Sequence, residues 1–270
     1  MKNVLFNNFM IFLTSILNIA LGQAQNQKQN LIIRQNIVYF KYANSSRDSI
    51  SLMLDVYQSS LVKVEHNPVI LFVHGGGFAA GDKEEDLYVK MASAFANHGY
   101  VAISINYTLK DEKLPYTNKI LERDISEVIE SLKWIKVNYS RYNMDTTRVI
   151  ICGDSAGGGI VVNTSFNCTN NQHFAGCIDL WGGLPGKSGW DGPIFIDKIE
   201  KCYPPTCIIH GTKDSVVPFK TSRNLSSRLT KKGIYNELHP LKGADHFPDK
   251  IPDLYIPIMI SFADKICSFN

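Results

Sequence analysis

The stretch that decides the fold is Val149-Ile150-Ile151-Cys152-Gly153-Asp154-Ser155-Ala156-Gly157-Gly158. It begins with an apolar run typical of a strand that is covered on both faces, and residues 156–164 after it favour a helix. Ser155 stands on the sharp turn between them, where a side chain on Gly153 or Gly157 would collide with the adjacent backbone. Such a turn lifts the serine hydroxyl above the sheet and directs the free N–H groups of the helix start toward it. The pattern predicts a nucleophilic serine, and a glycine-rich helix start is the alternative.

Similar apolar runs recur along the chain and alternate with helical patterns. Strands are expected at residues 69–73, 101–105, 149–152, 177–180, 206–209 and 237–241, and helices at residues 87–97, 120–137, 156–164 and 256–267, with Pro257 in the first turn of the last helix. Before them, residues 31–42 and 49–58 form two extended stretches joined by a segment of turn composition. Strands that alternate with helices imply crossover connections. We therefore predict an α/β fold: a mainly parallel, eight-stranded sheet with helices on both faces and an antiparallel hairpin at its N-terminal edge.

The N-terminus has the layout of a secretory signal peptide. Lys2 precedes an apolar stretch at residues 4–21, and small residues at Ala20, Gly22 and Ala24 permit cleavage after Gly22 or Ala24. An uncleaved membrane anchor is the alternative, but three asparagines interrupt the apolar stretch. We expect a signal peptide at 1–24, one domain at 25–270, and a secreted or periplasmic product with no stable membrane insertion after cleavage.

A glycine-rich loop supports a nucleophilic role for Ser155 independently of the turn that carries this serine. His74-Gly75-Gly76-Gly77-Phe78 follows the strand at 69–73 directly. Glycines expose backbone N–H groups, which stabilise the negative charge that develops on the carbonyl oxygen during attack on an ester. A flexible turn or a phosphate-binding loop is the alternative, but no phosphate-binding pattern follows.

A serine nucleophile needs a base, and the base needs an acid that holds it in place. Downstream of Ser155 the order acid and then base is met by Asp214 and His246, which both follow expected strands. The other downstream histidines fit less well: His210 ends a strand before Asp214, His239 lies within a strand pattern, and His173 lacks a suitably placed acid. Asp245 is a competing acid, but the side chains of adjacent residues usually diverge. The predicted catalytic set is Ser155, Asp214 and His246.

These motifs together resemble the hormone-sensitive-lipase and acetyl-xylan/feruloyl-esterase (carboxylesterase) group of α/β-hydrolases. The matching stretches are residues 74–78, Gly81-Asp82-Lys83, residues 153–158, Asp214 with Val217-Pro218, and His246, and Leu54-Asp55-Val56-Tyr57 resembles a strand of the small carbohydrate-esterase branch. The resemblance spans roughly residues 49–246. It implies an oxyanion hole formed by the N–H groups of Gly76, Gly77 and Ala156, and a structural role for Asp154.

Two departures limit the resemblance. Relatives usually carry an arginine where this chain has Thr108, so local support there differs. The chain is also too short for a large helical cap; only residues 181–205 could form a minimal lid, with Trp181 and Trp190 either lining it or packing ordinarily.

Composition excludes some function classes. The 28 basic and 25 acidic residues give a net charge of +3 and are dispersed, so nucleic acid is not an expected partner. Six cysteines show no metal-binding spacing. In an exported protein some could be bridged, first Cys202 with Cys207 and then Cys168 with Cys177.

The sequence thus predicts a serine carboxylic-ester hydrolase that acts through an acyl-enzyme on short-chain acyl or carbohydrate-linked esters, without metal or organic cofactor. A lipase or serine peptidase of the same fold is the first alternative. A non-catalytic binding protein on an esterase scaffold is the second.

Overall fold

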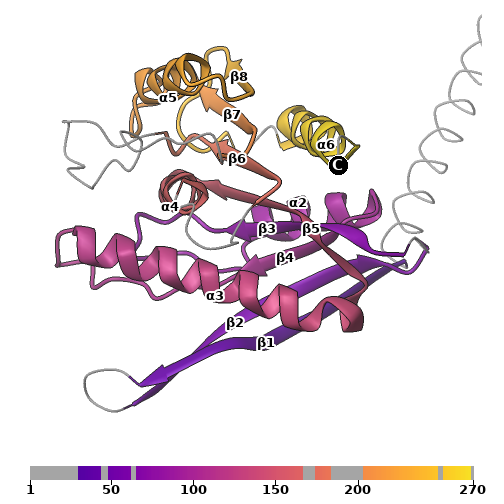
Figure 1. Cartoon of the computed structure of the whole chain (residues 1–270). Coiled ribbons are helices and arrows are strands. Elements are labelled where there is room, and N and C mark those ends of the chain that lie inside the picture. Colours follow the sequence, from indigo (N-terminus) through magenta and orange to yellow (C-terminus); the bar gives the residue numbers. More distant parts are fainter. Residues whose placement is uncertain are drawn as a thin grey trace, which may run out of the picture.

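The computed structural model describes residues 30–43, 48–61, 65–166, 174–183, 203–248 and 252–268. They build one eight-stranded sheet with the order β1-β2-β4-β3-β5-β6-β7-β8 (Figure 1). The strands are β1 (Leu31–Ala43), β2 (Ser49–Ser59), β3 (Asn67–Val73), β4 (Val101–Ile105), β5 (Met144–Asp154), β6 (Gly176–Leu180), β7 (Thr206–Gly211) and β8 (Asn236–Leu241). The pairs β1–β2 and β2–β4 are antiparallel and every other pair is parallel.

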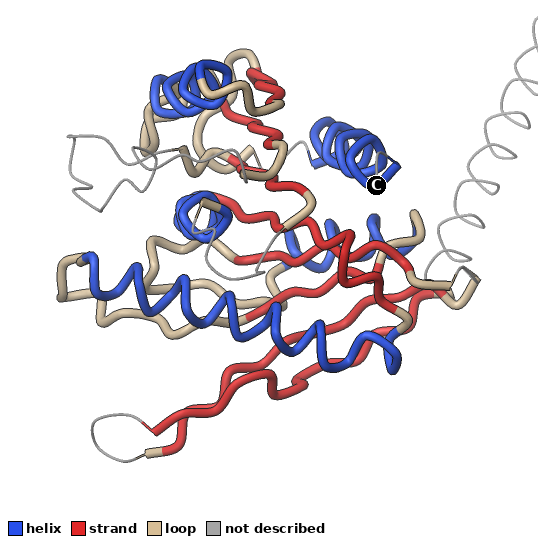
Figure 2. The backbone as a smooth tube through the Cα atoms, in the orientation of Figure 1, coloured by secondary structure: helices blue, strands red, loops and turns tan. Residues whose placement is uncertain are grey.

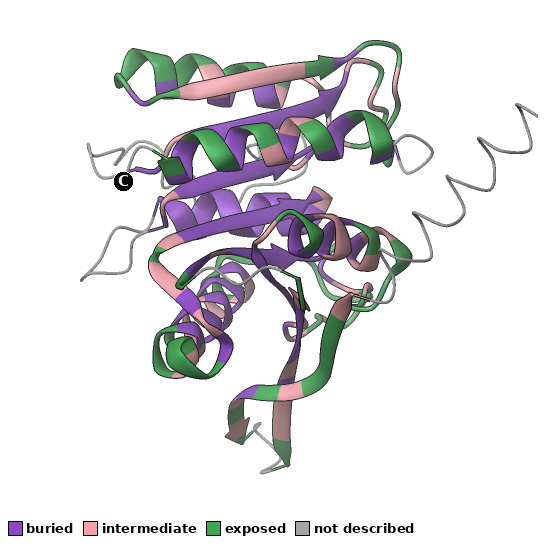
Figure 3. Ribbon diagram, turned by 90° about the vertical axis from the view of Figure 1, so that its right-hand side faces the viewer, coloured by how far each residue is buried: buried purple, intermediate pink, exposed green. Residues whose placement is uncertain are grey.

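Helices cover both faces of this sheet (Figures 1 and 2). They are α2 (Asp86–Asn97), α3 (Asn118–Tyr142), α4 (Ser155–Ser165), α5 (Lys220–Lys231) and α6 (Pro252–Ser268). Side chains of α3, α4 and α5 join one hydrophobic core, and side chains of α2 and α6 join the other. The inner strands are buried because both of their faces meet a helix layer, as Figure 3 shows.

The two edge strands differ from the inner ones. β1 is exposed along much of its length, and its pairing with β2 shifts register between Arg34 and Ile37 and again between Val38 and Phe40. Asn36, inside the first shift, has a φ of 57° and donates its N–H to Asp55 at 2.8 Å. At the other edge, β8 contains Pro240, which has no N–H to offer a further strand.

The predicted fold is confirmed, with two local differences. The polar helix α5 was not predicted, because only Ser222, Leu225 and Leu229 on it are buried. The final helix begins at Pro252, one turn earlier than predicted, so Pro257 lies inside it and not in the first turn. The apolar residues of α6 at spacings of three and four continue the buried face and outweigh the missing hydrogen bond.

The expected disulfides are not formed. Cys177 and Cys207 are free thiols buried within β6 and β7, where their side chains fill the two cores. Their expected partners, Cys168 and Cys202, lie outside the described residues, as do the predicted signal peptide, His173, Trp190 and most of the predicted lid. Of the helices that the structure describes, none has the length and apolar character needed to span a bilayer.

Candidate active site

Ser155 lies at the junction of β5 and α4, in the conformation that the flanking glycines permit. Its φ is 48°, a left-handed value that a non-glycine residue seldom adopts. A Cβ on Gly153 would lie 2.5 Å from the Gly157 carbonyl carbon, and a Cβ on Gly157 would lie 2.1 Å from the Val73 oxygen. Neither position accepts a side chain without a backbone shift. Close backbone packing therefore fixes a strained serine at the end of the strand, as the sequence suggested.

The structure brings the three predicted catalytic side chains together. Ser155 Oγ lies 2.9 Å from His246 Nε2, and His246 Nδ1 lies 2.7 Å from Asp214 Oδ2. A carboxylate only accepts hydrogen bonds, so Nδ1 carries the proton and the neutral ring keeps Nε2 free to accept from the serine. Ser155 is partly exposed, whereas the side chain of His246 is 3% exposed and that of Asp214 is fully buried. This arrangement can activate a hydroxyl at a position that a substrate can reach.

Asp214 is ionised in a buried position because hydrogen-bond donors surround it. Its Oδ1 accepts from the N–H groups of Val216 at 2.9 Å and Val217 at 2.7 Å. Its Oδ2 lies 2.7 Å from His246 and 3.0 Å from a second histidine, His210. Burial acts to raise the pKa of Asp214, but the bonds from His210, His246 and the Val217 N–H hold that pKa well below its usual range.

Asp245, the competing acid in the sequence, supports the loop instead. Its Oδ1 accepts from the Ser215 N–H and hydroxyl, both at 2.8 Å, and from the His246 N–H at 2.7 Å. The carboxylate thus ties the loop after β7 to the loop after β8 and does not contact the imidazole nitrogens.

The glycine loop follows β3, beside the start of α4. Gly76 has a φ of 98°, and a Cβ there would lie 2.1 Å from the Ala80 oxygen. Gly77 has a φ of 61° and faces open space. Ala156 lies in the first turn of α4, where N–H groups have no partner within the helix. Of the three predicted oxyanion-hole residues, Gly76 thus lies in a tight loop, Gly77 has open space beside it, and Ala156 lies at a helix N-terminus.

Two further contacts anchor this loop. Lys83 is buried and pairs with the buried Asp55 of β2 at 3.0 Å, which fixes the Gly81-Asp82-Lys83 segment against the sheet. The buried Asp154 accepts from the hydroxyl of Tyr88 and lies under Gly75, where a Cβ would be 2.8 Å from its carboxylate. Burial raises the pKa of Asp154 to about 7 even though the Gly75 N–H opposes that change. Asp154 therefore supports the glycine loop and does not contact His246.

The position of Thr108 is supported from α3. Glu127 accepts from the Thr108 N–H and hydroxyl, both at 2.7 Å, and the Arg123 guanidinium donates to the Thr108 carbonyl. Arg123 also pairs with Asp124 at 2.8 Å. A guanidinium from α3 thus contacts Thr108, the position at which the sequence departs from the resemblance, and this contact could not be seen in the sequence.

The remaining predicted residues lie away from the nucleophile or within the core. His239 pairs with Glu237 at 3.1 Å on β8. Trp181 is fully buried and packs edge-on against Tyr255 of α6 with ring centroids 5.4 Å apart. Of the two interpretations that the sequence allowed for Trp181, ordinary packing is therefore the one that the structure supports. His210 is the functional candidate that the sequence analysis set aside: its position four residues before Asp214 was the available signal.

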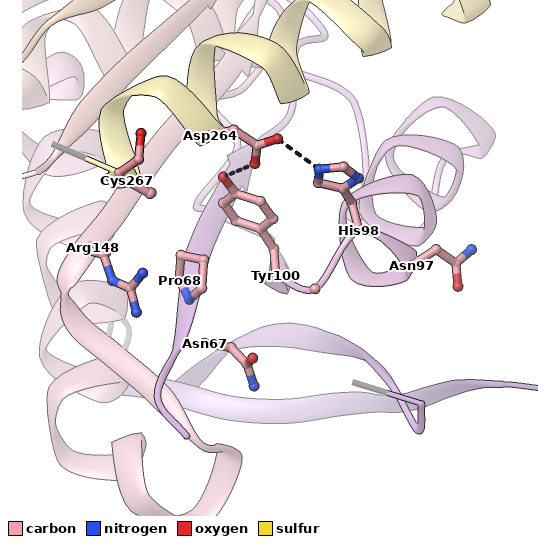
Figure 4. Close-up of a pocket in the computed structure, with 10 residues that line it drawn as sticks. Asn67, Pro68, Asn97, His98, Tyr100, Arg148, Asp264 and Cys267 are labelled. Carbon is pink, nitrogen blue, oxygen red and sulfur yellow. Dashed lines mark hydrogen bonds and ion pairs between the residues drawn. The ribbon is translucent and has the colours of Figure 1, made fainter. Parts of the chain in front are cut away.

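A depression lies at the end of the sheet opposite to Ser155 (Figure 4). This cavity of about 490 Å³ lies where β3 and β4 begin, and Asp264 there is 2.8 Å from His98 and accepts from Tyr100 at 2.9 Å. Ser155, Asp214 and His246 instead follow the carboxyl ends of β5, β7 and β8. Ligands of open α/β sheets bind at those carboxyl ends. We therefore place the functional site there. Within the described ranges, no three His, Cys, Asp or Glu side chains are grouped to hold a metal ion.

Fold and site geometry together place the chain among the proteins of the α/β-hydrolase fold. More particularly, residues 54–179 match the family model described as BD-FAE, and residues 194–255 match that of the Prolyl oligopeptidase family.

Several of the named relatives and solved structures to which the chain is similar are esterases. Esterase LipC of Mycobacterium tuberculosis is 23% identical over 221 residues, which cover 67% of this chain and 53% of LipC. The chain thus spans about half the length of that curated relative. Thermogutta terrifontis esterase 2 with bound butyrate superposes with a TM-score of 0.69 at 20% identity, covering 88% of this chain and 94% of the esterase. A truncated carbohydrate esterase from gut microbiota gives a TM-score of 0.71 at 19% identity, with coverage of 88% and 96%.

Proposed function

We propose that the protein is a serine carboxylic-ester hydrolase that works through an acyl-enzyme. The observation that carries this proposal is the continuous hydrogen-bonded line from Ser155 through His246 to the buried Asp214, with Ser155 in a strained, partly exposed turn. Such a line is the minimum that makes a serine hydroxyl nucleophilic at neutral pH. Named esterases among the relatives and structural neighbours support the same reaction class.

Each step of the reaction follows from the positions of these groups. His246 Nε2 takes the proton of Ser155 as Oγ attacks the ester carbonyl carbon. The N–H groups of Gly76, Gly77 and Ala156 stabilise the resulting oxyanion. The imidazolium, held by Asp214, then gives the proton to the oxygen of the alcohol as the carbonyl re-forms and the carbon–oxygen bond to the alcohol breaks. The acyl group stays on Ser155. Water attacks the acyl-enzyme by the same route and frees the acid.

Short-chain acyl or carbohydrate-linked esters are the substrates that we propose. The approach to Gly77 is open, and the loops that carry the acid and base expose Val216 at 65% and Phe247 at 51%. Small apolar surfaces beside an open approach suit a compact acyl or ring-shaped group better than a long chain. One structural neighbour is an esterase with bound butyrate and another is a carbohydrate esterase, and both agree with this range.

Labelling with a fluorophosphonate probe tests the reaction class. We expect one covalent adduct on Ser155, located by peptide mass spectrometry, and none in Ser155→Ala. That variant should lose about 10⁵- to 10⁶-fold in kcat and keep only the residual rate of the oxyanion hole. An unlabelled, folded wild-type protein would instead identify a binding protein on an esterase scaffold.

A substrate panel tests the finer assignment. We expect p-nitrophenyl acetate and butyrate, and acetylated xylan, to be hydrolysed faster than p-nitrophenyl palmitate. Preference for palmitate would indicate a lipase. The match of residues 194–255 to the Prolyl oligopeptidase family makes a peptidase the second candidate, so the panel includes an alanyl-prolyl p-nitroanilide. Faster turnover of that amide than of the esters would favour the peptidase.

We further propose that residues 1–24 direct export, to the medium or the periplasm. The basic Lys2, the apolar stretch and the small residues near position 22 support this. N-terminal sequencing of the exported protein should give a start after Gly22 or Ala24. Retention of the intact N-terminus in a membrane fraction would favour an anchor.

A further inference from the structure

Two imidazoles contact the same oxygen of Asp214. His246 Nδ1 lies 2.7 Å from Oδ2, and the other nitrogen of this ring contacts Ser155. His210 Nε2 lies 3.0 Å from the same oxygen, and this ring is buried in the interior. The proposed reaction uses only His246. His210 therefore contacts Asp214 directly but takes no part in the proposed proton transfers.

His210 is fixed at both of its ring nitrogens. It lies in β7, is fully buried, and its Nδ1 is 2.7 Å from the hydroxyl of Ser222 on α5. Its Nε2 is also 2.8 Å from the Val217 carbonyl oxygen. A carbonyl and a carboxylate can only accept, so Nε2 must carry a hydrogen that points between the two oxygens. The ring thus donates to Asp214 in a single orientation set by two different elements.

The charges around this pair explain why such a donor is needed. Asp214 has no exposed side-chain surface, and a buried carboxylate is stable only when its lone pairs are satisfied. The charged groups near His210 are Asp214 and the buried Asp179 of β6, whose own pKa burial raises; the exposed Asp245 lies on the outer side of Asp214. Without His210, His246 would be the remaining side-chain donor to Oδ2, and more of the carboxylate charge would face His246, while the Val216 and Val217 N–H groups would still share the charge on Oδ1.

We infer that His210 is a positioning residue that holds the Asp214 carboxylate in register with His246 and takes up part of its charge. This inference rests on the proposed function of Ser155, His246 and Asp214. Removing the donor has two consequences. The carboxylate gains freedom to rotate, which lowers kcat, and the unshared charge stabilises the imidazolium of His246. Only the neutral ring accepts the serine proton, so the acidic limb of the kcat/KM profile moves to higher pH.

The test compares His210→Leu, His210→Gln and His239→Leu with the wild type. His239 is the matched control because it lies on the adjacent strand β8 and pairs with Glu237. With p-nitrophenyl acetate we expect His210→Leu to lose roughly 10- to 100-fold in kcat with little change in KM. Its acidic limb should move to higher pH. His210→Gln keeps an N–H donor of similar reach and should recover part of both effects, and His239→Leu should match the wild type.

Two further measurements separate positioning from simple folding damage. Fluorophosphonate labelling counts the intact sites in each preparation, so kcat is expressed per labelled serine. The downfield proton resonance of the His246–Asp214 hydrogen bond, observed by ¹H NMR, reports on the geometry without any turnover. We expect this resonance to shift in His210→Leu and to return toward the wild-type position in His210→Gln.

An acidic limb and a proton resonance that are both unchanged in His210→Leu would overturn the inference and leave His210 as packing. A wild-type protein that takes no label and hydrolyses no ester would refute the proposed function separately. In that case the resonance in the two His210 variants still decides whether His210 holds Asp214.

Discussion

The two halves of the candidate site are held together by different forces. The nucleophile side consists of the glycine loop at residues 74–78 and the turn at residues 153–157, where added Cβ atoms would lie between 2.1 and 2.8 Å from neighbouring atoms at Gly75, Gly76, Gly153 and Gly157. The acid–base side consists of residues 210–218 and 243–247, which side-chain hydrogen bonds from Asp214, Asp245 and His210 connect. One half is fixed by backbone contact, the other by polar groups.

A buried carboxyl group lies in each half, Asp154 on the nucleophile side and Asp214 on the acid–base side, and their pKa values shift in opposite directions. Burial raises the pKa of Asp154, on the nucleophile side, to about 7. Burial also acts to raise the pKa of Asp214, but the hydrogen bonds from the histidines and backbone N–H groups around it have the larger effect and hold its pKa below the usual range. The comparison teaches that the nucleophile side, which is held by backbone packing, tolerates a carboxyl group with a raised pKa, whereas the acid–base side requires a charged carboxylate and supplies the hydrogen-bond donors for it.

The largest expected effect removes the charge on the acid–base side. Asp214→Asn keeps the size of the side chain but cannot hold His246 in the required tautomer. We expect kcat for p-nitrophenyl acetate to fall by about 10⁴-fold with the fold retained. Circular dichroism checks the fold. A fall of less than tenfold would contradict the assignment of Asp214 as the acid.

The next effect tests the backbone packing of the nucleophile side. Gly157→Ala places a Cβ 2.1 Å from the Val73 oxygen, whereas at Gly176 the nearest atom to an added Cβ is a side-chain carbon 3.4 Å away. A backbone shift at the serine turn should reduce kcat by about 100-fold or more and lower the melting temperature. Gly176→Ala is the matched control and should change kcat little. Equal activity in both variants would show that the turn is adaptable.

A smaller effect appears in the pH dependence of stability. Because the pKa of Asp154 is raised to about 7 in the folded state, the unfolded chain loses this proton first, and the folding stability falls as pH rises between about 4 and 7. Asp154→Asn has no such proton, so its free energy of unfolding should fall less over that interval. Urea denaturation at several pH values measures the slope. The exposed Asp253→Asn serves as control, and an unchanged slope in Asp154→Asn would contradict the raised pKa.

The smallest expected effect concerns the link between the two acid–base loops. Asp245→Ala removes the acceptor for the Ser215 and His246 N–H groups at an exposed position, where water replaces each lost bond. We expect kcat to fall by about 3- to 10-fold, because the loss of one or two modest hydrogen bonds loosens the base. Steady-state kinetics measures it. A loss as large as that of Asp214→Asn would reverse the roles assigned to the two acids.

The sequence predicted the nucleophile side more completely than the acid–base side, and the physical reason is local. The turn around Ser155 and the glycine loop are built from residues adjacent in the chain, so their conformational needs are visible as glycines. Asp214 and His246 could be chosen because chain order and strand ends restrict the candidates. The structure brings all three predicted side chains together, and their catalytic roles stay predictions until they are tested.

The contacts that the sequence analysis missed depend on how a loop folds back on its strand and on how a helix packs. His210 meets Asp214 only because the loop after β7 turns back upon its own strand, and Arg123 reaches Thr108 only through the packing of α3. Helix α5 escaped prediction because Leu225 and Leu229 are its only buried apolar residues. The predicted cysteine pairs were wrong because they were chosen by closeness in the sequence. Cys177 and Cys207 lie near their candidate partners along the chain, but their side chains point into the two hydrophobic cores.

The edges of the sheet have a consequence for how this protein behaves at high concentration. An unpaired edge strand offers its N–H and C=O groups as a template on which another chain can add a strand. Here β1 is interrupted by two register shifts and by Asn36 in a left-handed conformation, and β8 carries Pro240. Both edges therefore resist the addition of a strand from another molecule. The irregular backbone of β1 and the proline of β8 disfavour self-association through an extended sheet.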